Sequence, residues 1–199
     1  CSYSNYEWNL ILVLFEKFIK STHFTLWNNN IIEQILYIVA RDSETEYLSD
    51  LIAQDDELLI FLSECALAIG EPDVKWQLII RLQESKYREK ALELLELYVQ
   101  DKNEYVNRRA LMILANLNSD KTEYYCKIAW NRIEYFELQE YQRIAVLHAL
   151  YSVKSSLLEN YIELAKQDDQ KFLLKNALEI EQSVIDECQK AQTHFWTNV

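Results

Sequence analysis

The feature that most constrains this sequence is its near lack of turn-forming residues: 199 residues contain one glycine, Gly70, and one proline, Pro72. Sheet-rich and loop-rich folds need both types for their turns, and a chain of this length would ordinarily hold roughly ten or more of each. Apolar residues also recur at three- and four-residue spacing along almost the whole chain, which is typical of helices. Half of the residues are apolar, which is enough to bury a sizeable core. We therefore expect an all-α fold.

The periodicity predicts eleven helices joined by short polar turns. We find no glycine-, serine- or proline-rich linker between them, so a single domain over residues 1–199 is expected. The predicted helices cover residues 5–20, 29–41, 44–54, 57–69, 73–84, 87–100, 103–117, 121–136, 139–152, 156–167 and 170–192.

Some helix boundaries carry recognisable end signals. Ser43 with Glu46, and Ser156 with Glu159, have the spacing of a capping box, in which each side chain bonds a free amide of the first turn. The segment Gly70–Pro72 predicts that one helix ends at the glycine and the next begins near the proline.

A weak internal repeat appears when the predicted helices are aligned. Its pattern is an Asp, an apolar pair four residues later, and then a polar, a small and an apolar residue. The small residue lets a neighbouring helix approach closely, and one helix pair alone cannot bury such a face, so pairs must stack. Full copies run over residues 56–66, 101–111 and 168–178, and partial copies without the Asp over residues 87–92 and 141–146.

The copy Asp101–Leu117 resembles the second helix of a HEAT repeat, with a polar start, an apolar pair, an Arg and then Ala-Leu. The resemblance to the HEAT/armadillo class implies a right-handed α-α superhelix (a solenoid) of roughly four to five helix pairs. It also implies that the second helices line a concave surface, and that residues 1–41, which show no match, are atypical N-terminal capping helices. Most members of this class bind proteins and a minority act on nucleic acid, so the resemblance does not imply an enzyme.

Charge is unevenly distributed along this acidic chain, whose formal net charge is −12. From Arg41 to Asp73 there are ten acidic residues and one basic residue, whereas Lys86 to Arg132 holds nine basic and seven acidic ones. A concentrated acidic surface speeds encounter with a basic partner, and a negative chain disfavours nucleic acid. The alternative is a solvated outer face with acids placed at helix N-termini. The candidate partner-binding residues here are Asp42, Glu44, Glu46, Asp50, Asp55, Asp56, Glu57 and Glu64.

Three further candidates lie in the best repeat copy. Glu104, Arg108 and Met112 fall at i, i+4 and i+8, beside the apolar stripe, and would face a groove in a HEAT-like arrangement. The alternative is an ordinary pair between Glu104 and Arg108 within one helix, worth about 0.3–0.5 kcal/mol.

The sequence shows no pattern of catalytic or metal-binding residues. His23, His148 and His194 lie far apart and have no ligand neighbour at helical spacing; His148 is expected to be hydrogen-bonded at a helix edge. With Gly70 alone, a phosphate-binding loop, a dinucleotide fingerprint and a nucleophile elbow are all excluded. We therefore expect no catalytic residue, metal or cofactor.

The cysteines indicate a reducing compartment. Cys65, Cys126 and Cys188 are widely spaced, and we interpret them as small buried apolar residues of a cytoplasmic protein. The alternative is a lipid anchor on Cys1. The longest apolar run, from Leu10 to Phe15, is far below the roughly 20 residues that span a bilayer.

These observations favour a non-enzymatic domain that binds a basic protein through its acidic helical surface. Small size and negative charge fit an inhibitor or immunity protein that neutralises a basic toxin such as a nuclease. One alternative is a nucleic-acid-binding protein like the HEAT-like DNA glycosylases, with a local basic stripe of Arg108, Arg109, Lys127, Arg132 and Arg143. Another is a fragment of a larger scaffold whose apolar opening, Trp8 to Phe18, packs on another chain.

Overall fold

The computed structural model describes residues 5–197, and the side chains of Asn5, Phe136 and residues 191–197 lie outside that description. The described residues form α-helices and two short 3-10 helices with no strand, which confirms the all-α class. The elements are α1 (Asn5–Ser21), η1 (Phe24–Leu26), α2 (Asn29–Ala40), α3 (Tyr47–Ile52), α4 (Asp56–Ile69), α5 (Pro72–Leu82), α6 (Arg88–Tyr98), α7 (Glu104–Asn116), α8 (Thr122–Trp130), η2 (Phe136–Leu138), α9 (Gln139–Ser152), α10 (Leu158–Lys166) and α11 (Lys171–Thr197).

Both expected capping boxes are wrong. Ahead of α3, Glu46 has left-handed backbone angles (φ 54°) and no capping hydrogen bond from its side chain, which leaves Ser43 outside the helix end. Ahead of α10, Ser155 takes the place expected for Ser156, because its hydroxyl accepts the backbone N–H of Leu157 at 3.1 Å. A cap depends on the backbone angles of the turn, which residue spacing alone does not determine.

The boundary between α4 and α5 is where the sequence predicts it. Helix α4 ends at Ile69, and Pro72 occupies the first position of α5, where its missing N–H costs nothing. Gly70 has φ −75°, which any residue can adopt. Glycine is needed there because a Cβ would lie 2.7 Å from the carbonyl oxygen of Ala66.

Two later helices end in left-handed residues that are not glycine. Asn118 follows α7 with φ 49°, and Lys154 follows α9 with φ 51°. At the second of these turns the N–H of Ser155 bonds the carbonyl of Leu150 at 2.9 Å, and that of Lys154 bonds Tyr151 at 3.0 Å. This is the Schellman pattern, which closes the last turn of a helix.

The chain packs as two compact units, Cys1–Tyr98 (unit 1) and Val99–Val199 (unit 2). In unit 1, α5 packs between α2 and α4, and α4 also contacts α3 and α6. Tyr98, fully buried, closes this unit by donating its hydroxyl to the carbonyl of Ser63 at 2.6 Å. The expectation that residues 1–199 form a single domain, with 1–41 as its cap, stays a prediction.

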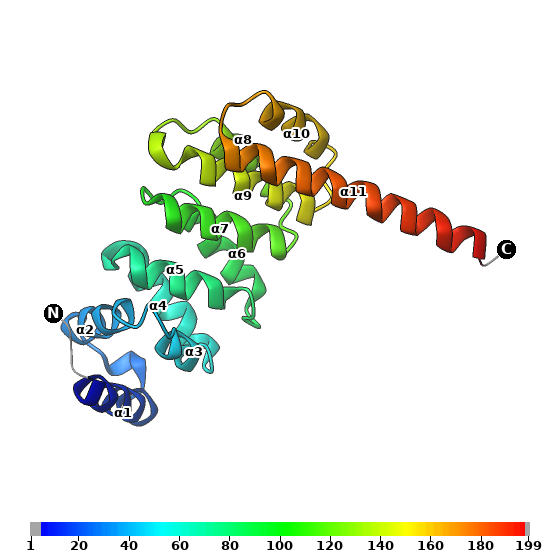
Figure 1. Cartoon of the computed structure of the whole chain (residues 1–199). Helices are drawn as coiled ribbons and strands as arrows, with labels where there is room; N and C mark the ends of the chain where they lie inside the picture. The colour runs from blue at the N-terminus through cyan, green and yellow to red at the C-terminus, as the bar shows by residue number, and fades with distance from the viewer. Residues whose placement is uncertain (1–4, 198–199) are drawn as a thin grey trace. The chain divides into compact units, whose positions relative to one another are not determined.

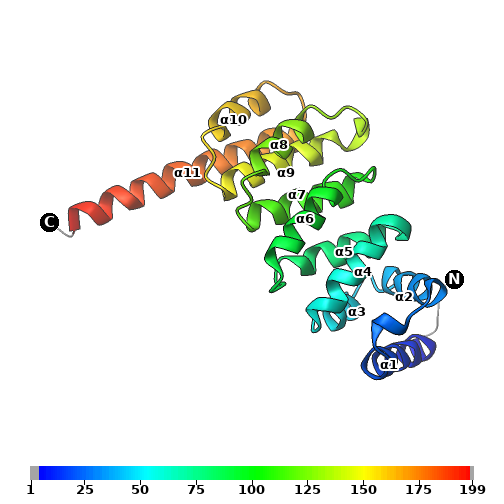
Figure 2. The same cartoon turned by 180° about the vertical axis from the view of Figure 1, so that it is seen from behind.

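In unit 2, alternate helices lie side by side. Helix α9 packs between α7 and α11, while α8 and α10 form a second layer against α9 and α11 (Figures 1 and 2). The small residues of the repeat lie at these contacts: Ala110, Ala145 and Ala177 are buried on α7, α9 and α11. The repeat pattern therefore identifies the positions of close helix approach in this unit.

Helix α11 is the longest element, with 27 residues against 14 in α9. The first half of α11 is tied to α10 by an ion pair, in which Lys166 of α10 contacts Glu181 at 2.6 Å. Tyr151 of α9 still contacts Glu187, and beyond that residue the helix extends past α9 and α10 (Figures 1 and 2).

Candidate recognition surface

Two candidates of the acidic segment, Asp42 and Asp55, accept hydrogen bonds from backbone amides in the first turns of α3 and α4. Asp42 is buried, and its carboxylate accepts the backbone N–H of Leu48 at 2.7 Å and the hydroxyl of Thr45. Asp55 caps α4 by accepting two amides of its first turn, that of Glu57 at 3.0 Å and that of the next residue at 3.2 Å. These two carboxylates stabilise local structure, and Asp42 is inaccessible to a partner.

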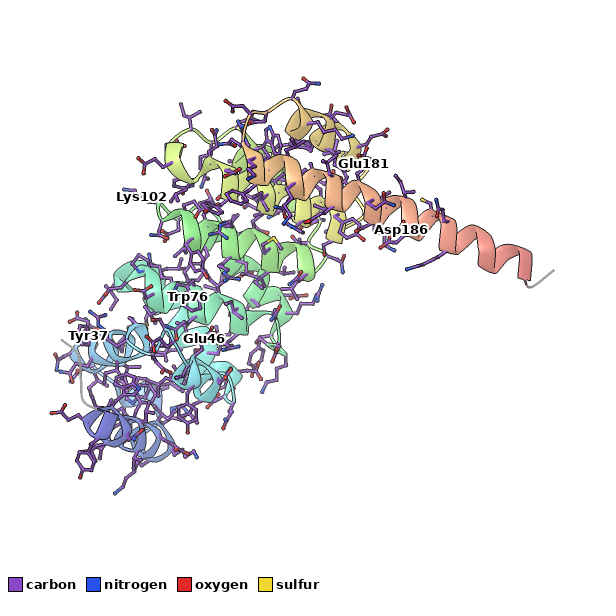
Figure 3. All side chains as sticks on the ribbon, viewed as in Figure 1. Tyr37, Glu46, Trp76, Lys102, Glu181 and Asp186 are labelled. Carbon is purple, nitrogen blue, oxygen red and sulfur yellow. The ribbon has the colours of Figure 1, made fainter. Side chains whose placement is uncertain are left out.

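Glu46 and Asp50 share one arginine. Arg81 of α5 contacts Glu46 at 2.8 Å through Nη2 and Asp50 at 3.0 Å through Nε. Glu46 lies in the turn that leads into α3 (Figure 3), so Arg81 ties that turn to α5. The arginine compensates charge that looks isolated in the sequence, because it comes more than 30 residues later.

Asp56 and Glu57, at the start of α4, face the turn before α6. Asp56 accepts the hydroxyl of Ser85 at 2.8 Å and the backbone N–H of Lys86 at 2.9 Å. Burial raises the pKa of Asp56, but these hydrogen bonds and the Lys86 charge outweigh it and leave the pKa below the usual aspartate value. Glu57 accepts the hydroxyl of Tyr87 at 3.1 Å.

The remaining acidic candidates are on the surface. Glu64 contacts Lys90 at 2.9 Å, and Glu71, beyond the candidate set, contacts Arg41 at 2.7 Å. Glu44 is exposed in the turn before α3. Much of the acidic segment is thus compensated by basic residues of later helices, yet unit 1 as a whole carries seventeen acidic and eight basic residues. Unit 2 carries fifteen and twelve, so most of the negative excess lies in unit 1.

A different surface forms around Arg108 in unit 2. Arg108 contacts the buried carboxylate of Glu104 through Nε at 2.7 Å and Nη2 at 3.4 Å. Its guanidinium carbon lies 5.0 Å from the ring centre of Tyr105 and 5.7 Å from that of Tyr141. Arg109 lies 4.8 Å from the Tyr105 ring and donates to its hydroxyl. We call Tyr105, Arg108, Arg109 and Tyr141 the Tyr–Arg cluster.

The cluster joins α7 to α9. Tyr141 of α9 is 47 % exposed, whereas Tyr105 and Arg108 are half-buried, as is the candidate Met112 one turn farther along α7. The ion pair predicted between Glu104 and Arg108 is present. Because Glu104 is buried and cannot move freely, its hydrogen bonds hold the Arg108 guanidinium in one position. An exposed ion pair within one helix does not restrict the arginine in this way.

Helix α9 also contacts α11 through side-chain hydrogen bonds. The Nε2 atom of His148 lies 3.1 Å from Oδ1 of Asn176 on α11, which confirms the expected hydrogen bond of this histidine at a helix edge. Tyr151 donates its hydroxyl to Glu187 at 2.6 Å, and this hydrogen bond raises the pKa of the tyrosine. Phe172, at the start of α11, is exposed. The helices α7, α9 and α11 therefore present several exposed or half-buried aromatic residues, among them Tyr105, Tyr141, Tyr151 and Phe172.

Two of the five residues in the basic stripe considered for nucleic acid pair with carboxylates, Arg108 with Glu104 and Arg143 with Asp168. Arg143 contacts Asp168 at 2.5 Å, and its guanidinium carbon lies 5.2 Å from the ring of the buried Trp130. Arg132 donates to the hydroxyl of Tyr135 at 3.1 Å. Lys127 is exposed on α8, in the other layer of unit 2 from Arg108.

The cysteines differ from the expected buried set. Cys126 is fully buried, and burial raises the pKa of its thiol to about 12. Cys65 is half-buried and Cys188 is exposed on α11, so the prediction is wrong for Cys188. Residue Cys1, the side chain of His194 and their predicted roles lie outside the described residues.

Among the side chains that the structure describes, His, Cys, Asp and Glu form no group of three or more that could hold a metal ion. No helix in this described part of the chain is both long and apolar enough to cross a membrane. The sequence matches no protein-family model, and no curated protein or solved structure is significantly similar to it.

Proposed function

We propose that this protein is a non-enzymatic protein-binding domain whose partner docks on the Tyr–Arg cluster. The observation that carries the proposal is an exposed tyrosine, Tyr141, beside an arginine that the buried Glu104 already holds in place. Tyrosine and arginine are enriched at protein interfaces and among the residues that dominate their binding energy. A side chain that is fixed before binding loses less entropy when the partner arrives.

The partner is a basic protein. The support is the excess of acidic residues in unit 1, which contains seventeen acidic and eight basic residues. The excess remains although several of the acids pair with bases of the same unit. Such a charge excess accelerates encounter with a positive partner at low salt. A cytoplasmic inhibitor or immunity protein that neutralises a basic toxin is the kind of protein that fits this combination.

The domain belongs to the HEAT/armadillo-like solenoids under this proposal. Support comes from unit 2, where α7, α9 and α11 pack side by side and α8 and α10 form the second layer. The alanines at corresponding positions of the repeat, Ala110, Ala145 and Ala177, are all buried there. Repeats of this kind present one layer of helices for recognition.

The test uses the whole 199-residue chain as bait for a basic partner and compares two variants, each with one tyrosine of unit 2 replaced. Tyr141→Ala removes the exposed ring of the cluster, and Tyr124→Ala removes a ring of similar exposure (59 %) on α8, in the other layer. We expect the affinity for a captured basic partner to fall at least tenfold, about 1.4 kcal/mol, for Tyr141→Ala only. Equal affinity of both variants would exclude the cluster as the docking site.

A further inference from the structure

Helix α1 carries an apolar face that the described residues leave exposed. Among its described side chains, residues 6–21, only Phe15 is buried. Tyr6, Leu10, Val13 and Leu14 are 78 %, 49 %, 62 % and 56 % exposed and lie on neighbouring turns of the helix. An amphipathic helix ordinarily buries such a stripe, and a contiguous exposed apolar patch marks an interaction site.

The helix is held in a fixed orientation by its C-terminal end. Phe18 stacks on Trp27 with ring centres 5.5 Å apart, and the indole N–H of Trp27 donates to the carbonyl of Thr22 at 3.2 Å. Glu16 accepts the hydroxyl of Tyr47, the first residue of α3, at 3.2 Å. These contacts use the C-terminal half of α1 and the side that faces the rest of unit 1, whereas the side chains of Tyr6, Leu10, Val13 and Leu14 remain exposed.

A groove lies along the edge of this face, between α1 and α2. Its volume is about 290 Å³, and all but one of its lining residues are apolar. The lining residues are Ile11, Leu14, Phe15, Phe18, Ile31, Gln34, Ile35 and Ile38. The groove can therefore receive apolar side chains of a second helix that packs along α1.

The charges on α1 show which helix fits. Glu7, Leu10, Leu14 and Lys17 are all exposed and follow one line along the helix, at i, i+3, i+7 and i+10. The stripe is thus bounded by an acid at its N-terminal end and a base at its C-terminal end. A second α1 running antiparallel places each leucine against a leucine and each Glu7 against the partner's Lys17. Twofold symmetry makes this contact twice.

We propose that the protein forms a symmetric homodimer through the exposed face of α1, with the two helices antiparallel. This surface is in unit 1 and is independent of the Tyr–Arg cluster, so either proposal can fail alone. Each helix is about 26 Å long at 1.5 Å per residue, so the contact is small and the dimer is of the weak class.

The first experiment measures the mass of the 199-residue chain by sedimentation velocity from about 5 to about 200 µM. Leu14→Arg puts a charge in the middle of the stripe and is expected to weaken dimerisation at least tenfold. Leu97→Arg is the matched control, because Leu97 of α6 is 55 % exposed in the same unit. Circular dichroism melting verifies that both variants fold.

The second experiment tests the antiparallel pairing itself. Glu7→Lys and Lys17→Glu each place like charges opposite one another, so each variant alone is expected to dimerise about tenfold more weakly than the wild type. An equimolar mixture restores opposite charges at both ends and is expected to recover the association. Recovery in the mixture cannot come from altered folding of either chain.

A monomer at every concentration would overturn the proposal. So would a dimer weakened equally by Leu14→Arg and Leu97→Arg, which would place the contact elsewhere. Dimers that form in each single charge variant as readily as in the mixture would overturn the antiparallel arrangement.

Discussion

Gln142 of α9 donates its side-chain amide to the side-chain oxygen of Asn107 on α7 at 2.7 Å, inside the core of unit 2. Both residues are fully buried, and Asn107 in turn donates to the backbone carbonyl of Val99. The two amides therefore link α9, α7 and the segment that leads into α7. A buried polar chain of this kind stabilises the fold only while its members stay paired.

Asn107→Ala is expected to lower the free energy of unfolding by about 2–4 kcal/mol, because the Val99 carbonyl and the Gln142 amide lose their partner inside the core. Urea unfolding followed by circular dichroism measures the change. Asn160→Ala, at an exposed site on α10, is the control and is expected to stay within about 0.5 kcal/mol. A cost as small as the control's would show that the amide chain does not contribute.

Lys154→Gly is expected to stabilise the protein by about 0.5–1 kcal/mol, because Lys154 has φ 51° and a side chain there is strained. Lys175→Gly, in the interior of α11, is expected to do the opposite and cost about 1 kcal/mol. Thermal melts of the two variants measure both shifts. The same sign at both sites would contradict the left-handed conformation after α9.

Iodoacetamide at pH 8 is expected to modify Cys188 rapidly and Cys126 only after unfolding. Cys188 is exposed, whereas burial raises the pKa of the Cys126 thiol to about 12, so roughly one thiol in 10,000 is ionised at that pH. Peptide mass spectrometry of a Cys1→Ser background, with and without urea, gives the rates. Fast native labelling of Cys126 would show that the α8 core opens.

Asp56→Asn is expected to lower stability at pH 7 by about 1–2 kcal/mol. The folded-state pKa of Asp56 lies below its unfolded value, so its contribution is present above the ordinary aspartate pKa and is lost as pH falls through the folded value. Urea unfolding at pH 7 and near pH 3 is expected to show the difference shrinking. Glu44→Gln, in an exposed turn, serves as the control. A difference independent of pH would exclude the ionised carboxylate as the cause.

The positions of the helices were largely predictable, because apolar periodicity is a local property. Each of the eleven predicted ranges overlaps one observed α-helix. The largest error in a helix boundary concerns α8. It was predicted to reach residue 136, but it ends at Trp130. The following turn is held by Tyr135, which donates its hydroxyl to the carbonyl of Asp101 at 2.8 Å, a contact 34 residues distant that periodicity does not show.

The surface was predictable only in part, because it depends on which helices become neighbours. The spacing of Glu104 and Arg108 indicated their contact. Tyr141 was not among the predicted binding residues, because its proximity to Arg108 follows from the packing of α9 on α7. The sequence also could not show how much charge of the Arg41–Asp73 segment is compensated, because Arg81, which pairs with two of its acids, comes from a later helix.

The length of α11 has a mechanical consequence. At 1.5 Å per residue the helix is about 40 Å long, roughly twice the length of α9, and only its first part has α9 and α10 beside it. Since an α-helix is stiff over this distance, it acts as a lever. A tilt of about 10° at its start would displace its C-terminal end by about 7 Å, so slight repacking of unit 2 is magnified there.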